Sequence, residues 1–370
     1  MSDFILKKAS ILCYRIYDIA DEIDLERMRQ VVKEDARRAR LTREGSQYLQ
    51  LPNPPLALEL GRRSLSLLGG EVQVEARVRF FDHGAASLIL SVPVAPGLSL
   101  SALTPLADEL YDSPAVETLC LEILQALRQQ AQSALRGAHL WEQNESYTVI
   151  FVEEMEGHPT AQEVLRSVEL PKLLLGEANP KHLSAGEWHD VIQANFSYWD
   201  DDLVIIDWNS AFVYEPSGSR DIPDILEICN AQLLELRYYD SVLDGQTARI
   251  YAALEEQPGG LKAIFASPYR DLVRRLQVTL LEMNEFIDRL ENSLKIIGDI
   301  YLAKVYESSV VQLRIRAWQA TITRKQQALH DVYQLLKGEV DTARSLTLET
   351  IIVVLIVVEL FIALGPLLRH

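Results

Sequence analysis

The sequence predicts an α+β domain, then a long α-helical region that forms a coiled coil or helix bundle, and finally one C-terminal transmembrane helix. Three observations predict this order: strand-like alternation in the first part of the chain, heptad spacing of apolar residues after it, and a continuous apolar run at the end. We expect the boundaries to be 1–220 for the soluble domain, 221–346 for the helical stalk and 347–368 for the membrane helix.

The composition is that of a globular protein with an acidic surface. Of the 370 residues, 48% are hydrophobic and 24% are charged, and the net charge is −17. Such a charge repels phosphate backbones, so we expect no direct sequence-specific binding of nucleic acid. The basic stretch Arg37–Arg43 is interpreted as a solvated helix face rather than an RNA contact.

The cysteines and the N-terminus indicate a reducing compartment. Cys13, Cys120 and Cys229 lie far apart in apolar surroundings and lack CxxC spacing, which favours buried thiols. The first residues contain neither the apolar core of a signal peptide nor an acid-poor presequence. We therefore expect the body of the protein to be cytoplasmic.

The first part of the chain mixes strands and helices. Val72–Phe81 alternates apolar and polar residues, and Leu88–Val94 follows as its hairpin partner, with a tight turn at Asp82–Gly84. The remaining predicted elements are strands at Ser10–Ile19, Leu56–Leu60, Tyr147–Val152, Val191–Tyr198 and Leu203–Trp208, and helices starting near Leu25 and covering Ala115–Leu135 and Ala161–Leu175.

Helix-forming residues dominate from Ile222 onward. A first amphipathic helix is interrupted by Pro258–Gly260, and a third segment from Val311 to Leu336 leads into the apolar tail. The segment between them keeps strict heptad spacing, which fits either an intramolecular helical hairpin or an oligomerisation seam. The residues of this predicted seam are Val273, Leu276, Leu280, Met283, Ile287, Leu290, Leu294, Ile297 and Tyr301.

The C-terminal run Thr347–Leu368 is long enough to span a bilayer, with a buried soluble helix as the alternative. Glu359 lies inside it, and an ionised carboxylate there is costly unless neighbouring helices surround it. The segment is similar to a tail anchor, and the basic residues that precede it between Arg324 and Arg344 favour a cytoplasmic body.

Four segments carry a resemblance to a known family: VRFFDHGAASLIL, FSYWDDDLVIIDWN, LEICNAQLLELRYYDSVLD and LETIIVVLIVVELF. Together they resemble the family named for being required for meiotic nuclear division, also called domain of unknown function 155, from roughly Val72 to the C-terminus. His83 departs from the aromatic residue that members of that family have. The resemblance implies a self-assembling membrane protein that supports translation, by tethering ribosomes, and the absence of a presequence makes the chain similar to a bacterial member.

No nucleotide-binding, metalloprotease or serine-hydrolase motif is present, so we expect no enzyme activity, cofactor or metal site. The acidic triplet Asp200–Asp202 is better interpreted as a hairpin turn than as a cation site, and His182 and His189 as part of a solvated loop. Asp240 falls at a core position of the helix, where it needs a partner such as an arginine. The candidate functional polar residues are Asp82, Gly84, Tyr238, Tyr239, Asp240, Asp244, Glu349 and Glu359.

These features predict a membrane-anchored homo-oligomeric scaffold or tether in the bacterial inner membrane, with one span per chain. Its expected partners are further copies of itself, the lipid bilayer, and the ribosome or other membrane-associated machinery. The alternative is a channel or transporter subunit of broadly CorA-like architecture, in which Glu359 would ring a pore. Against it, the sequence lacks the GMN signature and the second span of those channels.

Overall fold

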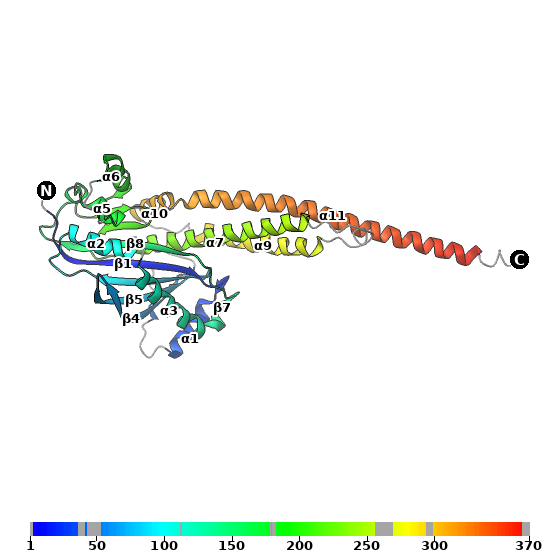
Figure 1. Ribbon diagram of the computed structural model, residues 1–370, viewed down its shortest axis with the longest axis horizontal. Coiled ribbons are helices and arrows are strands. Elements are labelled where there is room, and N and C mark those ends of the chain that lie inside the picture. The colour runs from blue at the N-terminus through cyan, green and yellow to red at the C-terminus, as the bar shows by residue number, and fades with distance from the viewer. Residues whose placement is uncertain are drawn as a thin grey trace. The chain divides into compact units, whose positions relative to one another are not determined.

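A computed structural model describes residues 3–35, 41–42, 53–111, 113–177, 179, 183–255, 269–293 and 299–364. Figure 1 shows the chain as a ribbon coloured from its N-terminus to its C-terminus. Contacts within the chain divide it into two compact units. The first unit combines Met1–Tyr238 with Arg289–Trp318, and the second combines Tyr239–Asp288 with Gln319–His370. The division therefore differs from the predicted boundary near residue 220, because a later helical segment belongs with the N-terminal domain.

The first unit is built on a sheet that has nine strands in the described part of the chain. Neighbouring strands are antiparallel except for β8 and β11, which run parallel. In spatial order the strands are β3 (Leu41–Thr42), β4 (Leu56–Leu67), β5 (Gly70–Phe80), β6 (Ala85–Pro93), β1 (Leu6–Asp18), β8 (Asn144–Met155), β11 (Ser210–Tyr214), β10 (Leu203–Ile206) and β9 (Asn195–Phe196). A small second sheet pairs β2 (Glu22–Ile23) with β7 (Leu135–Arg136).

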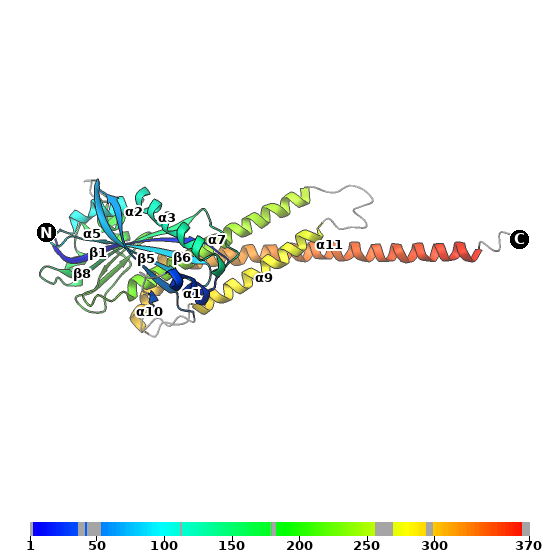
Figure 2. The same cartoon turned by 90° about the horizontal axis from the view of Figure 1, so that it is seen from below.

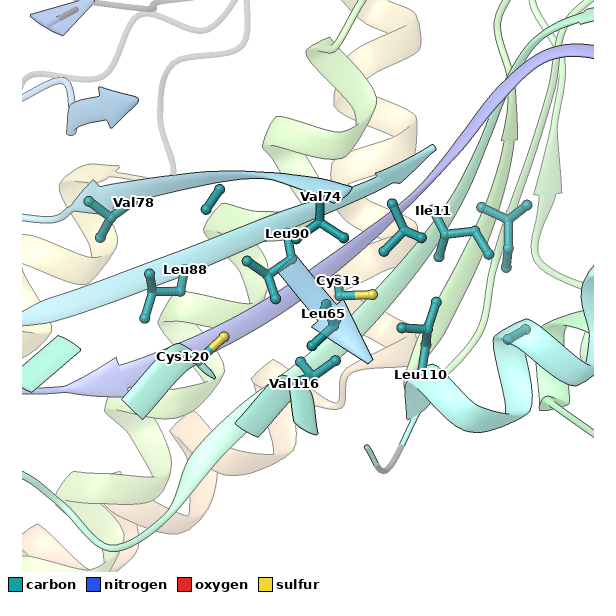
Figure 3. Packing of buried hydrophobic residues seen from close by; sticks show 14 of the residues in the cluster. Ile11, Cys13, Leu65, Val74, Val78, Leu88, Leu90, Leu110, Val116 and Cys120 are labelled. Atoms are coloured by element: carbon teal, nitrogen blue, oxygen red, sulfur yellow. The ribbon is translucent and has the colours of Figure 1, made fainter. Parts of the chain in front are cut away.

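Both faces of the sheet are covered, which explains why the central strands have long apolar runs. On one face, alternate residues of β1, β5 and β6 pack against helices that follow them in the chain, α2 (Thr104–Tyr111) and α3 (Pro114–Gln130). Figure 3 shows this core, in which Cys13 and Cys120 are buried among aliphatic side chains. The prediction of buried thiols is confirmed for all three cysteines.

The N-terminal half of helix α7 (Asp221–Glu255) covers the opposite face, where its first turns lie beside Leu12, Tyr14 and Ile89. Ile225, Leu226 and Cys229 on this half are fully buried. Helix α10 (Ile300–Gln312) packs next to β10. The unit is therefore a sheet with helices on both sides. Figure 2 shows its strands together with α2, α3 and α10.

The β5–β6 hairpin is confirmed, with Glu75–Phe80 paired to Ala86–Ser91 in antiparallel register. Two other predicted elements are wrong. The expected strand at Val191–Tyr198 is instead the end of α6 (Ala185–Ile192) followed by the two residues of β9, because Ser184 caps that helix through the Glu187 N–H (3.1 Å).

The expected helix over Ala161–Leu175 is two short helices, α4 (Ala161–Leu165) and α5 (Leu170–Leu175). Pro171 has no N–H to donate and can only lie in a first helical turn, so α5 starts anew beside it. The N-terminal helix α1 covers Leu25–Asp35.

In the part of the chain that the structure describes, the second unit is a bundle of three helices. It contains the C-terminal part of α7, helix α9 (Arg270–Ser293) up to Asp288, and helix α11 (Ile315–Leu364) from Gln319. Hydrogen bonds join α7 to α9 (Gln246 to Thr279, 3.3 Å) and α11 to α9 (Gln326 to Asn284, 2.6 Å). The buried residues recur at heptad spacing: Leu243 and Ile250 on α7, Leu276, Leu280 and Met283 on α9, and Ile322, Leu329 and Leu336 on α11.

The residues of the predicted seam thus differ in burial and do not all lie on the same helix. Leu276, Leu280 and Met283 are buried within their own chain, which supports the helical-hairpin interpretation for these three. Val273 and Ile287 are half-buried, whereas Leu294 and Ile297 and the side chain of Leu290 lie outside what the structure describes. Tyr301 belongs to a different helix, α10, so it does not share a helix with Leu276, Leu280 and Met283.

Candidate functional site

The predicted turn Asp82–Gly84 packs directly against the end of β1. The N–H of Ile19 donates to the Gly84 carbonyl (3.1 Å), and the N–H of Ile23 donates to the Asp82 carbonyl (2.9 Å). Gly84 has φ +114°, and a Cβ at this position would lie 1.9 Å from the carbonyl oxygen of Ala20. Gly84 is therefore required by a close approach of two backbones, which is a structural reason for the residue.

Beside this turn lie two imidazole–carboxylate pairs that the sequence analysis did not identify. Nε2 of His139 is 3.1 Å from Oδ1 of Asp18, and its Nδ1 is 2.9 Å from the Gly137 carbonyl. Both ring nitrogens therefore face acceptors, which favours the doubly protonated ring. Burial alone would lower the pKa of His139, but the interaction with Asp18 raises it to about 9.

The second pair joins the turn to helix α7. Nδ1 of His83 is 3.3 Å from Oε1 of Glu235, which is almost completely buried. Burial raises the pKa of Glu235 to about 7, against the opposing effect of His83. Phe81 stacks on the His83 ring at 5.3 Å between centroids. We call Asp18, His83, His139 and Glu235 the histidine–carboxylate cluster.

Aromatic rings close one side of the cluster. Tyr238, on the same helix as Glu235, stacks on His139 with centroids 5.0 Å apart and an interplanar angle of 12°. Trp141 meets the Tyr238 ring edge-on at 5.7 Å. The sequence candidates Asp82, Gly84 and Tyr238 lie beside this cluster, whose charges are carried by other residues.

Further charges lie between α7 and the sheet. The Arg79 guanidinium donates to Asp224 (2.8 Å) and to Glu227, which is fully buried. Towards the end of the N-terminal half of α7, Arg237 pairs with Glu145 of β8. One face of α7 therefore presents acidic and basic groups to complementary partners on the sheet.

Chemically, the cluster can exchange protons near neutral pH, because its imidazole and carboxyl pKa values are shifted towards or above that range. Neither His83 nor His139 has a side chain that is more than a quarter exposed. Among the residues that the structure describes, no group of three or more His, Cys, Asp and Glu residues is arranged to hold a metal ion. The geometry supports a role in holding α7 on the sheet.

The candidates Asp240 and Asp244 lie in the helix bundle and share one cation. Nζ of Lys325, on α11, is 2.7 Å from Oδ1 of Asp240 and 2.6 Å from Oδ1 of Asp244. The predicted partner of Asp240 thus exists, but it is a lysine and not an arginine. Partial burial would lower the pKa of Lys325, whereas its hydrogen bonds to the two aspartates raise it. Tyr239 lies half-buried on the same helix.

Two of the remaining candidates lie on exposed positions. Glu349 and Glu359 are both exposed on α11. In the acidic triplet, the Asp200 carbonyl accepts the Ala161 N–H (2.7 Å) and Asp202 accepts the Tyr198 N–H (2.7 Å), as expected for a turn between strands. His189 lies on α6, and His182 falls outside the described residues.

The apolar C-terminal run is the end of α11. This helix is long and apolar enough to cross a membrane, and none of its apolar window is buried in the protein. Its large side chains from Ile351 to Ile362 are between 45% and 75% exposed. The structure describes the predicted span as far as Leu364, and residues 365–368 lie outside the described part.

Comparison with known proteins corrects the resemblance drawn from sequence segments. The matching family is described as "Uncharacterized protein MJ0711, N-terminal domain" and covers residues 8–220. A relative is uncharacterized protein MJ0711 of the archaeon Methanocaldococcus jannaschii, 24% identical over 180 residues, or 48% of this chain. The aligned part spans about half of that protein, 54% of its length. No solved structure matches.

The resemblance to the meiotic-division family is therefore wrong, and so is the assignment to a bacterial member of it. The four segments that suggested it are short and individually common patterns of a strand, a hairpin, an amphipathic helix and an apolar run. The match also begins at residue 8, in the part of the chain that the rejected resemblance left out. By its sequence over residues 8–220, the chain belongs to the MJ0711 N-terminal domain family.

Proposed function

We propose that this protein is a membrane-anchored scaffold, in which α11 inserts into a bilayer and the sheet domain remains in water. The observation that carries the proposal is the exposed apolar surface of α11 from Leu346 to Ile362. Exposed apolar patches of this extent are rare on soluble monomers and mark contact with a membrane or a partner.

The dimensions agree with a single span. The described apolar segment Leu346–Leu364 would measure about 28 Å as a helix at 1.5 Å per residue, against about 30 Å for the hydrocarbon core of a bilayer. All backbone hydrogen bonds of a helix are internal, so the segment can enter lipid without unpaired groups. Basic residues precede it on the same helix, and they favour a cytoplasmic position for the rest of the protein.

Glu359 supports assembly into homo-oligomers. An ionised carboxylate in the middle of a bilayer costs roughly 2.5–3.5 kcal/mol on insertion scales, so it faces other helices or a polar cavity. Within the described part of the chain, no second apolar helix is available to cover it. Copies of α11 from neighbouring chains would supply that cover, whereas the buried residues of α9 would not take part.

Membrane attachment can be tested with two leucines of the same helix. Leu355 lies in the apolar segment and is 61% exposed, and Leu335 lies in the bundle and is 72% exposed. Replacing a mid-membrane leucine by arginine changes insertion by about 3–4 kcal/mol, so Leu355→Arg should weaken partitioning into liposomes by roughly 100-fold or more. Leu335→Arg is the matched control and should partition as the unaltered protein does. A full chain that stays soluble and monodisperse without detergent or lipid would overturn the proposal.

Assembly is tested by the mass of the detergent-solubilised chain, measured by light scattering after size-exclusion chromatography. We expect a multiple of the 41.8 kDa chain mass. Glu359→Leu should shift the distribution towards smaller species, whereas Glu359→Gln, which retains hydrogen-bonding groups, should preserve it. A monomer for the unaltered protein would rule out the homo-oligomer.

The exposed Glu359 also supports one alternative, a channel in which a ring of these carboxylates lines a pore. This alternative requires ion flux into liposomes that contain the purified protein, and the flux must change in Glu359→Gln. Absence of flux in oligomeric, correctly inserted protein would leave the scaffold as the function.

A further inference from the structure

A second site, which shares no residue with the histidine–carboxylate cluster, lies in the first unit. It is a pocket of about 400 Å³ between the turn that precedes β10, the loop that joins β11 to α7, and the start of α10. These three segments come from residues 198–202, 215–222 and 299–302. The fold therefore brings two segments that are close in the chain, 198–202 and 215–222, together around one cavity with a third, 299–302, that lies much later in the chain.

The pocket is strongly acidic. The described residues that line it include Asp201, Asp202, Glu215, Asp221 and Asp299, and none of these described lining residues is Lys, Arg or His. Like charges that line one pocket destabilise one another, and a bound cation would relieve that repulsion. Burial first, and then the charges of Glu215 and Asp201, raise the pKa of Asp202, as expected from this crowding.

Backbone hydrogen bonds fix several of these carboxylates without neutralising them. Asp299 accepts the N–H groups of Tyr301 (2.7 Å) and Leu302 (3.0 Å) as the N-cap of α10. Glu215 accepts the Ser217 N–H (3.1 Å). Among the described residues, none of the five carboxylates forms an ion pair with a Lys, Arg or His side chain.

Three aromatic rings accompany the acids. Trp199 is 67% exposed and Tyr198 is 60% exposed, and their rings meet edge-on with centroids 4.9 Å apart. The Tyr198 ring lies 5.4 Å from the Tyr301 ring. Exposed aromatic faces next to carboxylates are the combination that attracts organic cations, through the ring quadrupole and through charge.

An unsatisfied hydroxyl belongs to a residue that lines the pocket, Tyr301. The Tyr301 hydroxyl oxygen is buried and has no hydrogen-bond partner. A buried polar atom left without a partner is costly, and a ligand donor that reached this hydroxyl would remove that cost. Burial and the charges of Asp202, Glu215 and Asp299 raise the pKa of Tyr301, so the phenol stays neutral and can accept a hydrogen bond.

We propose that this pocket binds a guanidinium or ammonium group, as found in an arginine or lysine side chain or in a small amine. Such a group would stack on Trp199 or Tyr198, donate to the free carboxylate oxygens, and donate to the Tyr301 hydroxyl. A guanidinium fits best, because its flat, weakly hydrated face stacks on aromatic rings and its edge pairs with carboxylates in a bidentate manner. The proposal does not depend on membrane attachment.

Calorimetric titration of the detergent-solubilised full chain tests the proposal. The probes are N-acetyl-Gly-Arg-Gly-amide, agmatine as a free guanidinium, and the peptide with citrulline in place of arginine. We expect the arginine peptide to bind saturably, with a dissociation constant below about 1 mM that increases with added salt. The neutral citrulline peptide should bind at least roughly tenfold more weakly. Agmatine binding as tightly as the peptide would identify a small amine as the ligand, and tighter peptide binding would identify a polypeptide.

Variants assign the binding to this pocket. Trp199→Ala and Glu215→Gln should each weaken arginine-peptide binding roughly tenfold. Tyr251→Ala removes an aromatic ring that is 66% exposed elsewhere, and Glu122→Gln removes an exposed acid, so both controls should bind normally. The proposal is overturned if the citrulline peptide binds equally, if no guanidinium binds, if Mg²⁺ alone binds, or if the pocket variants behave like the controls.

Discussion

Gly84→Ala should be among the most destabilising single changes in the first unit, even though it adds one methyl group. The new Cβ would lie 1.9 Å from the Ala20 carbonyl oxygen, well inside the 3.0 Å that real Cβ atoms keep. Relief requires the turn to move away from the end of β1 by more than 1 Å, which would break the hydrogen bonds from Ile19 to Gly84 and from Ile23 to Asp82.

The magnitude follows from these parts. A side chain at φ +114° contributes about 1–3 kcal/mol of backbone strain, and each lost backbone hydrogen bond contributes about 0.5–1.5 kcal/mol. With two such hydrogen bonds lost, we therefore expect the free energy of unfolding to fall by roughly 2–6 kcal/mol. Urea denaturation of the detergent-solubilised full chain, followed by far-UV circular dichroism, would measure the change.

Gly97→Ala is the matched control. Gly97 also has a positive φ of 91°, but a Cβ there would meet nothing within 4 Å. It should therefore cost only the backbone strain, about 1–2 kcal/mol. Equal effects of Gly84→Ala and Gly97→Ala would refute the close approach as the reason for Gly84, and would leave a direct functional role for that glycine as the better explanation.

Three further changes address the charged contacts. The folded pKa of His139 is about 9, above its ordinary value of 6.5, so the stability that it contributes is fully present below pH 6.5 and is lost as the pH rises through 9. In His139→Gln the midpoint of urea unfolding should therefore depend less on pH between pH 7 and 9. The same pH dependence as in the unaltered protein would contradict the pairing of His139 with Asp18. Arg79→Met should lower the free energy of unfolding by about 3–5 kcal/mol, because it leaves Glu227 buried without its cation. Adding Glu227→Leu should restore much of this loss in the same urea assay. A double variant as unstable as the single one would show that the packing of Arg79, and not its charge, dominates. Lys325→Met should lower the stability of the bundle by about 1 kcal/mol, because Asp240 and Asp244, one helical turn apart, then repel each other. Asp244→Asn should have less than half that effect in thermal unfolding. The reverse order would mean that Lys325 acts mainly through packing.

The sequence was sufficient where the signal is local. The hairpin at Val72–Phe81 and Leu88–Val94 was predictable because period-two alternation and the turn at Asp82–Gly84 lie within about 20 residues of each other. The apolar end of α11 was predictable for the same reason. Val191–Tyr198 was not, because a short apolar run fits a strand or a helix end equally well, and here the Ser184 cap decides for the helix.

The histidine–carboxylate cluster was out of reach for a different reason. Its members come from the end of β1, the β5–β6 turn, the loop after β7 and helix α7, and no sequence spacing links these segments. Glu235 gave the one available signal, an acid on a helix rich in apolar residues. Heptad spacing in α9 likewise showed that one face is apolar, but it could not show that helices of the same chain cover Leu276, Leu280 and Met283.

The ionic face of α7 explains how this helix finds one position on the sheet. Repeating apolar residues alone would let a long helix pack in several registers one turn apart. Glu227 and Glu235 are eight residues apart, about 12 Å along a helix, and their partners Arg79 and His83 are four residues apart, at most about 14 Å along the chain. A slip of one turn, about 5.4 Å, would remove both carboxylates from their partners and leave them buried and unpaired. The charges therefore select the register, and the apolar residues supply the burial.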